Sequence, residues 1–107
     1  FITILLILLT KCTNWNPDNI EESWKRGDYI NKALKKYFDV NKKYPNNLED
    51  LIPNYIKKIE PPVAGNGKWI YEIDNTGYFL GFGDDDPDGD PISYWRYQKK
   101  EWVIDTR

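Results

Sequence analysis

The first half of the chain has an amphipathic pattern. Apolar side chains recur at spacings of three and four over residues 20–38, with one interruption near Gly27. This spacing places them on one face of a helix, which we expect over residues 18–43. Asp18 and Glu21 form a capping-box pattern at the predicted start of this helix.

A short second helix is expected soon after the first. Asn47 can cap the sequence LEDLIPNYI at residues 48–56, with Asp50 in its first turn. The loop that follows, residues 59–68, is rich in proline and glycine. It marks a change of periodicity within one domain.

Beyond this loop the apolar positions alternate with a period of two, which is typical of strands. The sequence Asn75-Thr76-Gly77 is expected to form a hairpin turn. The expected strands are residues 69–74, 78–83, 93–98 and 101–105. One long helix followed by four antiparallel strands in a meander predicts an α+β fold of two layers, with the helix packed on the sheet.

The apolar face of the helix and the aromatic face of the sheet are the two surfaces that must meet. The residues expected to be buried between them are Trp24, Ile30, Leu34, Phe38, Trp69, Tyr71, Leu80 and Trp102. Phe79, Tyr94 and Arg96 alternate with this set, so we expect them on the opposite face of the sheet, where they are candidates for a partner surface.

Composition narrows the function classes. The chain has 107 residues, a net charge of −2, no histidine and a single cysteine. The low net charge gives no field that attracts nucleic acid, and the missing histidine removes the common nucleophilic triads and His-ligated metal sites. We interpret four lysine pairs as solvated surface, namely Lys35-Lys36, Lys42-Lys43, Lys57-Lys58 and Lys99-Lys100.

The first residues, FITILLILLT, form an apolar run followed by Lys11 and Cys12. The run is about half of the ~20 residues that span a bilayer, and it fits the apolar part of a signal peptide. We therefore expect residues 1–12 to be a signal or anchor segment and residues 13–107 to be the globular domain. The expected location is the periplasm or cell envelope, either membrane-anchored or secreted.

Leu9 and Cys12 also have the spacing of a lipoprotein signal, so Cys12 is a candidate for lipidation. The alternative is a signal segment with an incidental cysteine. Because methionine is absent even at position 1, we take the chain as a fragment or a processed form.

The sequence GFGDDDPDGDP at residues 81–91 holds five aspartates within seven positions. Asp84, Asp86 and Asp88 are spaced like the first ligands of an EF-hand loop, but Trp95 stands where that loop has its bidentate glutamate. Two interpretations remain. The segment binds one calcium ion, with Asp90 or nearby carbonyls completing the shell, or it is a solvated turn. Clustered aspartates on a loop bind cations more often than they catalyse, so we do not expect an enzyme.

Three stretches together resemble a known family. They are ALKKYFDVNKKYPNNLEDLIPNYI at residues 33–56, GKWIYEID at residues 67–74 and GYFLGFGDDDPDGDPISYW at residues 77–95. In order and spacing they are similar to the globular part of type IV pilin-like proteins, most closely the major pseudopilin of type II secretion, over about residues 20–95. The resemblance implies a calcium loop, protein partners in a secretion or pilus-like assembly, and membrane contact through the N-terminal segment.

The sequence also differs from the pattern of that family in several places. Leu5 replaces the family's glutamate, Lys11 ends the apolar run early, and residues 62–65 replace an Asp-Pro-Trp-Gly sequence. An alternative function therefore remains, that of a periplasmic or surface lipoprotein that uses a pilin-like domain as a binding module.

Overall fold

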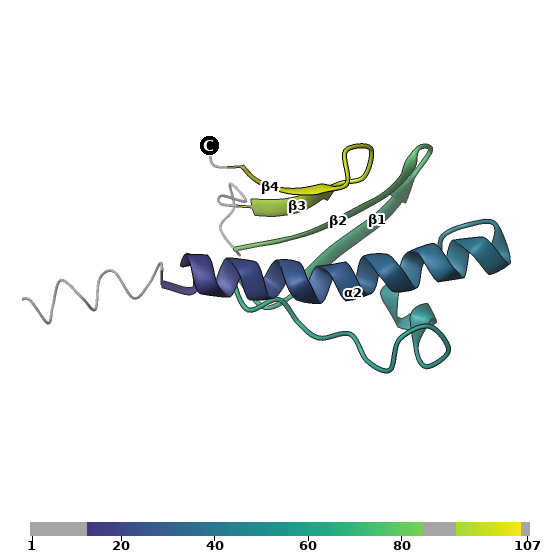
Figure 1. Ribbon diagram of the computed structural model, residues 1–107, viewed down its shortest axis with the longest axis horizontal. Helices are drawn as coiled ribbons and strands as arrows, with labels where there is room; N and C mark the ends of the chain where they lie inside the picture. Colours follow the sequence, from purple (N-terminus) through teal and green to yellow (C-terminus); the bar gives the residue numbers. More distant parts are fainter. Residues whose placement is uncertain (1–12, 85–91, 106–107) are drawn as a thin grey trace, which may run out of the picture.

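The computed structural model describes residues 13–84 and 92–105. The elements in chain order are the 3-10 turn η1 (Thr13–Trp15), the helix α2 (Pro17–Asn41), the 3-10 turn η2 (Leu48–Leu51), and the strands β1 (Trp69–Asp74), β2 (Gly77–Gly83), β3 (Ile92–Arg96) and β4 (Glu101–Asp105). The helix and the segment that follows it lie over one face of the sheet, and no other described segment covers the opposite face (Figure 1). The predicted α+β arrangement of one long helix on a four-stranded antiparallel sheet is confirmed.

Helix α2 begins at a side-chain cap. The Asn16 side chain accepts a hydrogen bond from the amide of Asn19 at 2.9 Å, and this satisfies one of the free N–H groups of the first turn. Pro17 follows at the first helical position, where its missing N–H costs nothing. The predicted cap at Asp18 is wrong, because the chain is already helical there.

The helix ends two residues earlier than expected. Lys42 adopts a left-handed conformation with φ of 61°, and its amide donates to the carbonyl of Phe38 at 2.7 Å. The predicted second helix over residues 48–56 is also wrong, since only the four residues of η2 are helical and residues 52–55 continue as a turn. Ile52, which precedes Pro53, is extended, as expected for a residue before proline.

The four strands form an antiparallel sheet in the order β1-β2-β3-β4, so each strand pairs with its neighbour in sequence. Asn75 and Thr76 form a two-residue connection between β1 and β2, and Gly77 follows with φ of 150°. Pairs across the sheet place the helix-facing residues in rows, including Phe82 with Ser93 and Trp95 with Trp102. The meander and the turn were both predicted. Strands β1 and β4 have the predicted bounds, β2 begins one residue earlier than predicted, and β3 begins one residue earlier and ends two residues earlier.

The core lies between α2 and the near face of the sheet. Ile30, Leu34 and Leu80 are fully buried, as predicted. Four of the aromatic residues that were expected in this core are only half-buried, at its margins. They are Trp24, Trp69, Tyr71 and Trp102. The prediction for Phe38 is wrong, because its side chain is 38% exposed and its ring packs on Tyr44, with centroids 4.7 Å apart, outside the main helix–sheet contact.

Gly27 explains the interruption in the apolar pattern of the helix. A Cβ atom at this position would lie 2.4 Å from the ring of Trp102 and 3.1 Å from the ring of Trp69. The absence of a side chain therefore lets the helix backbone contact the two tryptophans directly. The Trp102 indole also donates a hydrogen bond to Asp28, the next residue of the helix, at 2.9 Å.

Ser23 fixes the loop before β1 against the helix. Its hydroxyl is fully buried, donates to the carbonyl of Asn19 at 2.8 Å, and accepts from the amides of Val63 at 2.8 Å and Ala64 at 3.0 Å. The same loop reaches the end of β2, where the amide of Asn66 donates to the carbonyl of Gly83 at 2.7 Å. The loop thus joins the helix start to the point where the acidic segment begins.

Candidate functional site

The acidic segment connects two paired strands. Gly83 at the end of β2 pairs with Ile92 at the start of β3, so residues 84–91 join adjacent antiparallel strands. Asp84 is half-buried, and its Oδ2 accepts a hydrogen bond from the Trp15 indole at 3.1 Å. The Trp15 ring stacks on Phe82 with centroids 5.6 Å apart. The first aspartate of the segment is therefore held at a fixed place on the domain.

The predicted calcium ligands Asp86, Asp88 and Asp90 lie outside the described residues. Within residues 13–84 and 92–105, the structure shows no group of three or more histidine, cysteine or acidic side chains that could hold a metal ion. Asp84 is chemically suited to such a site, because a hard cation prefers carboxylate oxygens and the Trp15 hydrogen bond occupies only Oδ2.

The face of the sheet away from α2 carries the predicted partner surface. Phe79 on β2 and Tyr94 on β3 stack with ring centroids 5.7 Å apart. Gly81 lies opposite Tyr94 in the strand register, and a Cβ at Gly81 would be 3.1 Å from that of Tyr94 and 3.2 Å from the Phe79 ring. Glycine thus leaves room for the two rings to meet over it. Arg96, at the end of β3, is exposed.

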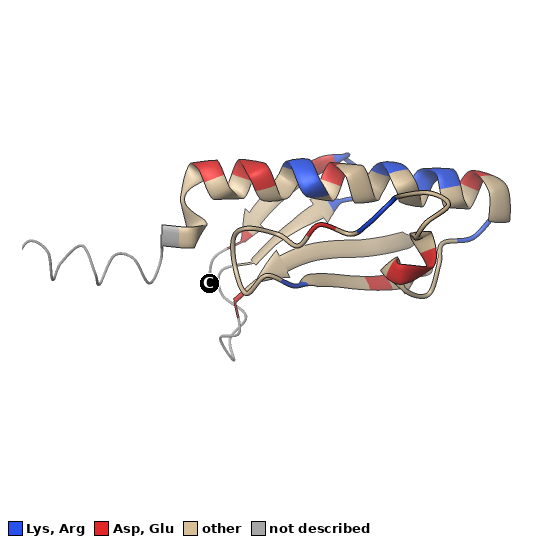
Figure 2. Ribbon diagram, turned by 90° about the horizontal axis from the view of Figure 1, so that it is seen from below, with Lys and Arg blue, Asp and Glu red and all other residues tan. Residues whose placement is uncertain are grey.

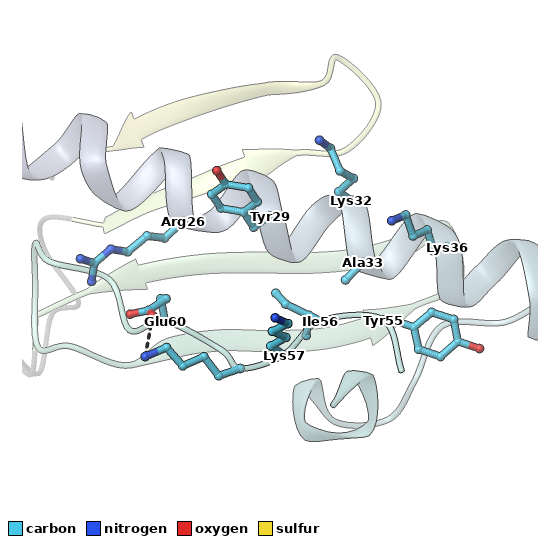
Figure 3. Close-up of a pocket in the computed structure, with 10 residues that line it drawn as sticks. Arg26, Tyr29, Lys32, Ala33, Lys36, Tyr55, Ile56, Lys57 and Glu60 are labelled. Atoms are coloured by element: carbon cyan, nitrogen blue, oxygen red, sulfur yellow. Dashed lines mark ion pairs between the residues drawn. The ribbon is translucent and has the colours of Figure 1, made fainter. Parts of the chain in front are cut away.

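A groove that the sequence did not predict runs between α2 and the segment 55–60. Its volume is about 280 Å³. The helix contributes Arg26, Lys32 and Lys36, and the segment opposite contributes Lys57, Lys58 and Glu60 (Figure 3). We call it the cationic groove. The basic residues of the helix and of the segment lie beside one another in the charge-coloured view (Figure 2).

Sequence reasoning interpreted Lys36, Lys57 and Lys58 as members of solvated pairs, and it made no prediction for Lys32. The spacing of Arg26, Lys32 and Lys36 indicates one side of a helix, and that signal was present in the sequence. The position of Lys57 beside them depends on how the irregular segment after η2 folds back along the helix. No local pattern in the sequence specifies that path.

Tyrosines join the far end of the helix to the sheet. The hydroxyls of Tyr44 and Tyr97 are 2.6 Å apart, and Tyr78 donates to Asn31 Oδ1 at 2.7 Å. Burial, as the largest cause, raises the pKa of Tyr78 and of Tyr44 well above the ordinary value for tyrosine, and for Tyr44 the hydrogen bond to Tyr97 adds to the effect. These hydroxyls therefore stay protonated and serve as hydrogen-bonding groups.

Cys12 and the rest of the expected signal or anchor segment lie outside the described residues. In the described part of the chain, no helix has the length and apolar character required to cross a membrane.

The sequence and fold were compared with those of known proteins. No protein-family model, no curated protein and no solved structure matches this chain. Its function is therefore inferred from its own residues.

Proposed function

We propose that this protein is a non-enzymatic, pseudopilin-like subunit of a type II secretion or pilus-like assembly, with a calcium-stabilised connection between β2 and β3. The resemblance in sequence supports this, and the arrangement of one long helix on a four-stranded antiparallel meander is consistent with it. The assembly would supply protein partners, and residues 1–12 would provide the membrane contact.

The observation that carries the proposal is the hydrogen bond between Trp15 and Asp84. Trp15 lies two residues before α2, and Asp84 begins the acidic segment, so the contact joins the chain's entry into the domain to the proposed calcium loop. Calcium binding at the loop would therefore act directly on the point where the apolar N-terminal segment meets the domain.

A calcium ion would be held by Asp84, Asp86 and Asp88, with Asp90 or nearby carbonyls completing the shell. Its contribution would be to neutralise carboxylates that otherwise repel one another. The chain's own part is to hold Asp84 in place through Trp15 and to bring the two ends of the segment together through the pairing of Gly83 with Ile92.

Calcium should raise the melting temperature. For a site with a Kd of ~10⁻⁴ M, ~1 mM calcium stabilises the folded state by ~1.4 kcal/mol, which corresponds to a shift of about 7 °C in a domain of this size. We expect this shift in the wild type, measured by calorimetry with calcium against chelator, and its loss in Asp86→Ala/Asp88→Ala. The matched control is Glu49→Ala/Asp50→Ala, which removes two exposed carboxylates on η2 and should keep the shift. A wild-type melting temperature that does not change up to several millimolar calcium would show that the segment is a solvated turn.

Location and assembly can be tested in cells that express the full gene. We expect the protein in the envelope fraction, and brief chemical cross-linking should join it to other envelope proteins in adducts larger than the monomer. A cytosolic enzyme followed in the same fractions is the control. Recovery as an uncross-linked cytosolic monomer, with residues 1–12 retained, would contradict the proposal.

The open sheet face favours one alternative, a surface lipoprotein with a binding module. The stacked pair of Phe79 and Tyr94 places aromatic area on a face that no described segment covers. Incorporation of labelled fatty acid that disappears in Cys12→Ala would favour this alternative over a pseudopilin-like subunit.

A further inference from the structure

The cationic groove concentrates positive charge in an otherwise acidic protein. Five cations and one carboxylate line it, which gives the groove a net charge of +4. The whole chain carries −2, so the remaining residues together carry −6. Positive charge is therefore concentrated in the groove, whereas the remaining residues are acidic as a group.

The cations of the groove fall into two groups. Arg26 is held by Glu22 at 2.9 Å and by the carbonyl of Pro61 at 2.9 Å, and Lys58 is held by Glu60 at 3.0 Å. In contrast, Lys32, Lys36 and Lys57 are exposed and form no ion pair with any described residue; these three are the unpaired lysines of the groove. The paired cations fix the walls, and the unpaired lysines are available to a ligand.

The floor and rim of the groove are partly apolar. Tyr29 projects from the helix with 55% of its surface exposed, and Ile56 and Tyr55 lie across from it on the other wall (Figure 3). A ligand that fits both features carries negative charges and also offers apolar or aromatic side chains between them.

The dimensions favour an extended peptide. Residues 26 to 36 of a helix rise by about 15 Å, a length that four or five residues of extended chain cover. Because charges spread over this length do not converge on one point, a single small anion would contact only part of them. A long polyanion or an anionic bilayer would extend past the groove and meet the acidic remainder of the surface, which repels it.

We propose that the cationic groove binds a short acidic segment of a partner protein in an extended conformation. Carboxylates of the segment would contact Lys32, Lys36 and Lys57, and an apolar residue between them would lie on Tyr29. This inference depends neither on calcium nor on location in the envelope.

The test uses the purified chain and a fluorescein-labelled eight-residue peptide in which glutamate alternates with leucine. We expect saturable binding by fluorescence anisotropy at low salt, weakened by added sodium chloride, and little binding of the matching peptide with glutamine in place of glutamate. In Lys32→Gln/Lys36→Gln/Lys57→Gln the affinity should fall about tenfold or more. Backbone amide shifts on addition of the peptide should be largest in residues 26–36 and 55–58.

The control is Lys35→Gln/Lys68→Gln/Lys99→Gln, which removes the same charge from exposed lysines outside the groove and should bind like the wild type. Circular dichroism checks that both triple variants fold. Equal loss in the two triple variants, or no saturation by the glutamate peptide, would overturn the proposal. So would stronger binding of inorganic phosphate, anionic phospholipid vesicles or single-stranded oligonucleotide. Self-association of the wild type that the groove variant abolishes would assign the groove to a second copy and also overturn it.

Discussion

At the scale of single residues, Gly27 sets the distance between the two layers of the protein. Replacing Gly27 by alanine has two opposing effects on the stability of the protein. Alanine favours a helix interior by about 1 kcal/mol over glycine, whereas overpacking costs about 1–3 kcal/mol. The second effect should prevail, because the new Cβ would lie 2.4 Å from a Trp102 ring that is also held by its hydrogen bond to Asp28.

We therefore expect Gly27→Ala to lower the free energy of unfolding by about 1 kcal/mol, measured by urea denaturation. A double-mutant cycle with Trp102→Ala isolates the cause. In that background the alanine should be neutral or stabilising, because the ring that it overlaps is gone. Equal destabilisation in both backgrounds would show that the close approach to Trp102 is not the reason.

The same residue shows what the sequence could and could not predict. The interruption of the apolar stripe at Gly27 was visible, but its reason depends on Trp102, which is 75 residues away in the chain. Ile30, Leu34 and Leu80 were predicted correctly because helix and strand periodicity determine which way they point. Phe38 was predicted wrongly, since periodicity does not specify where the helix extends beyond the sheet.

At the scale of elements, local signals predicted α2 and the four strands well. The irregular segment between η2 and β1 could not be predicted in the same way, because its path is fixed by contacts distant in sequence. Ser23 holds the amides of Val63 and Ala64, and the Trp69 indole donates to the carbonyl of Glu60 at 2.7 Å. The cationic groove depends on this path, and for that reason the sequence did not reveal it. The acidic segment was evident from composition, whereas the hydrogen bond from Trp15 to Asp84 was not.

At the scale of the whole molecule, the buried tyrosines link stability to pH. Below about pH 10 the hydroxyl of Tyr78 is protonated in both the folded and the unfolded chain, so it adds no pH dependence. Above that pH the unfolded chain releases the proton and the folded chain retains it, because burial raises the pKa of Tyr78. The folded state then binds more protons than the unfolded state, and stability falls as the pH rises.

We expect the free energy of unfolding to decrease between pH 10 and pH 11 by up to about 1.4 kcal/mol for a tyrosine of this kind. Urea denaturation at pH 8, 10 and 11 measures this decrease. At pH 8, Tyr78→Phe should lower the free energy of unfolding by about 1 kcal/mol, because the variant lacks the hydrogen bond to Asn31. Above pH 10, the free energy of unfolding of this variant should decrease less steeply than that of the wild type. Parallel declines in wild type and variant would contradict the assignment to Tyr78.

The contact between Trp15 and Asp84 also has a spectroscopic consequence. The indole donates directly to the first carboxylate of the acidic segment and stacks on Phe82. Its emission depends on the local electric field, and a cation arriving beside Asp84 would change that field. The protein thus carries its own fluorophore at the entrance to the segment, and Trp15→Phe would remove that signal while leaving the aspartates in place.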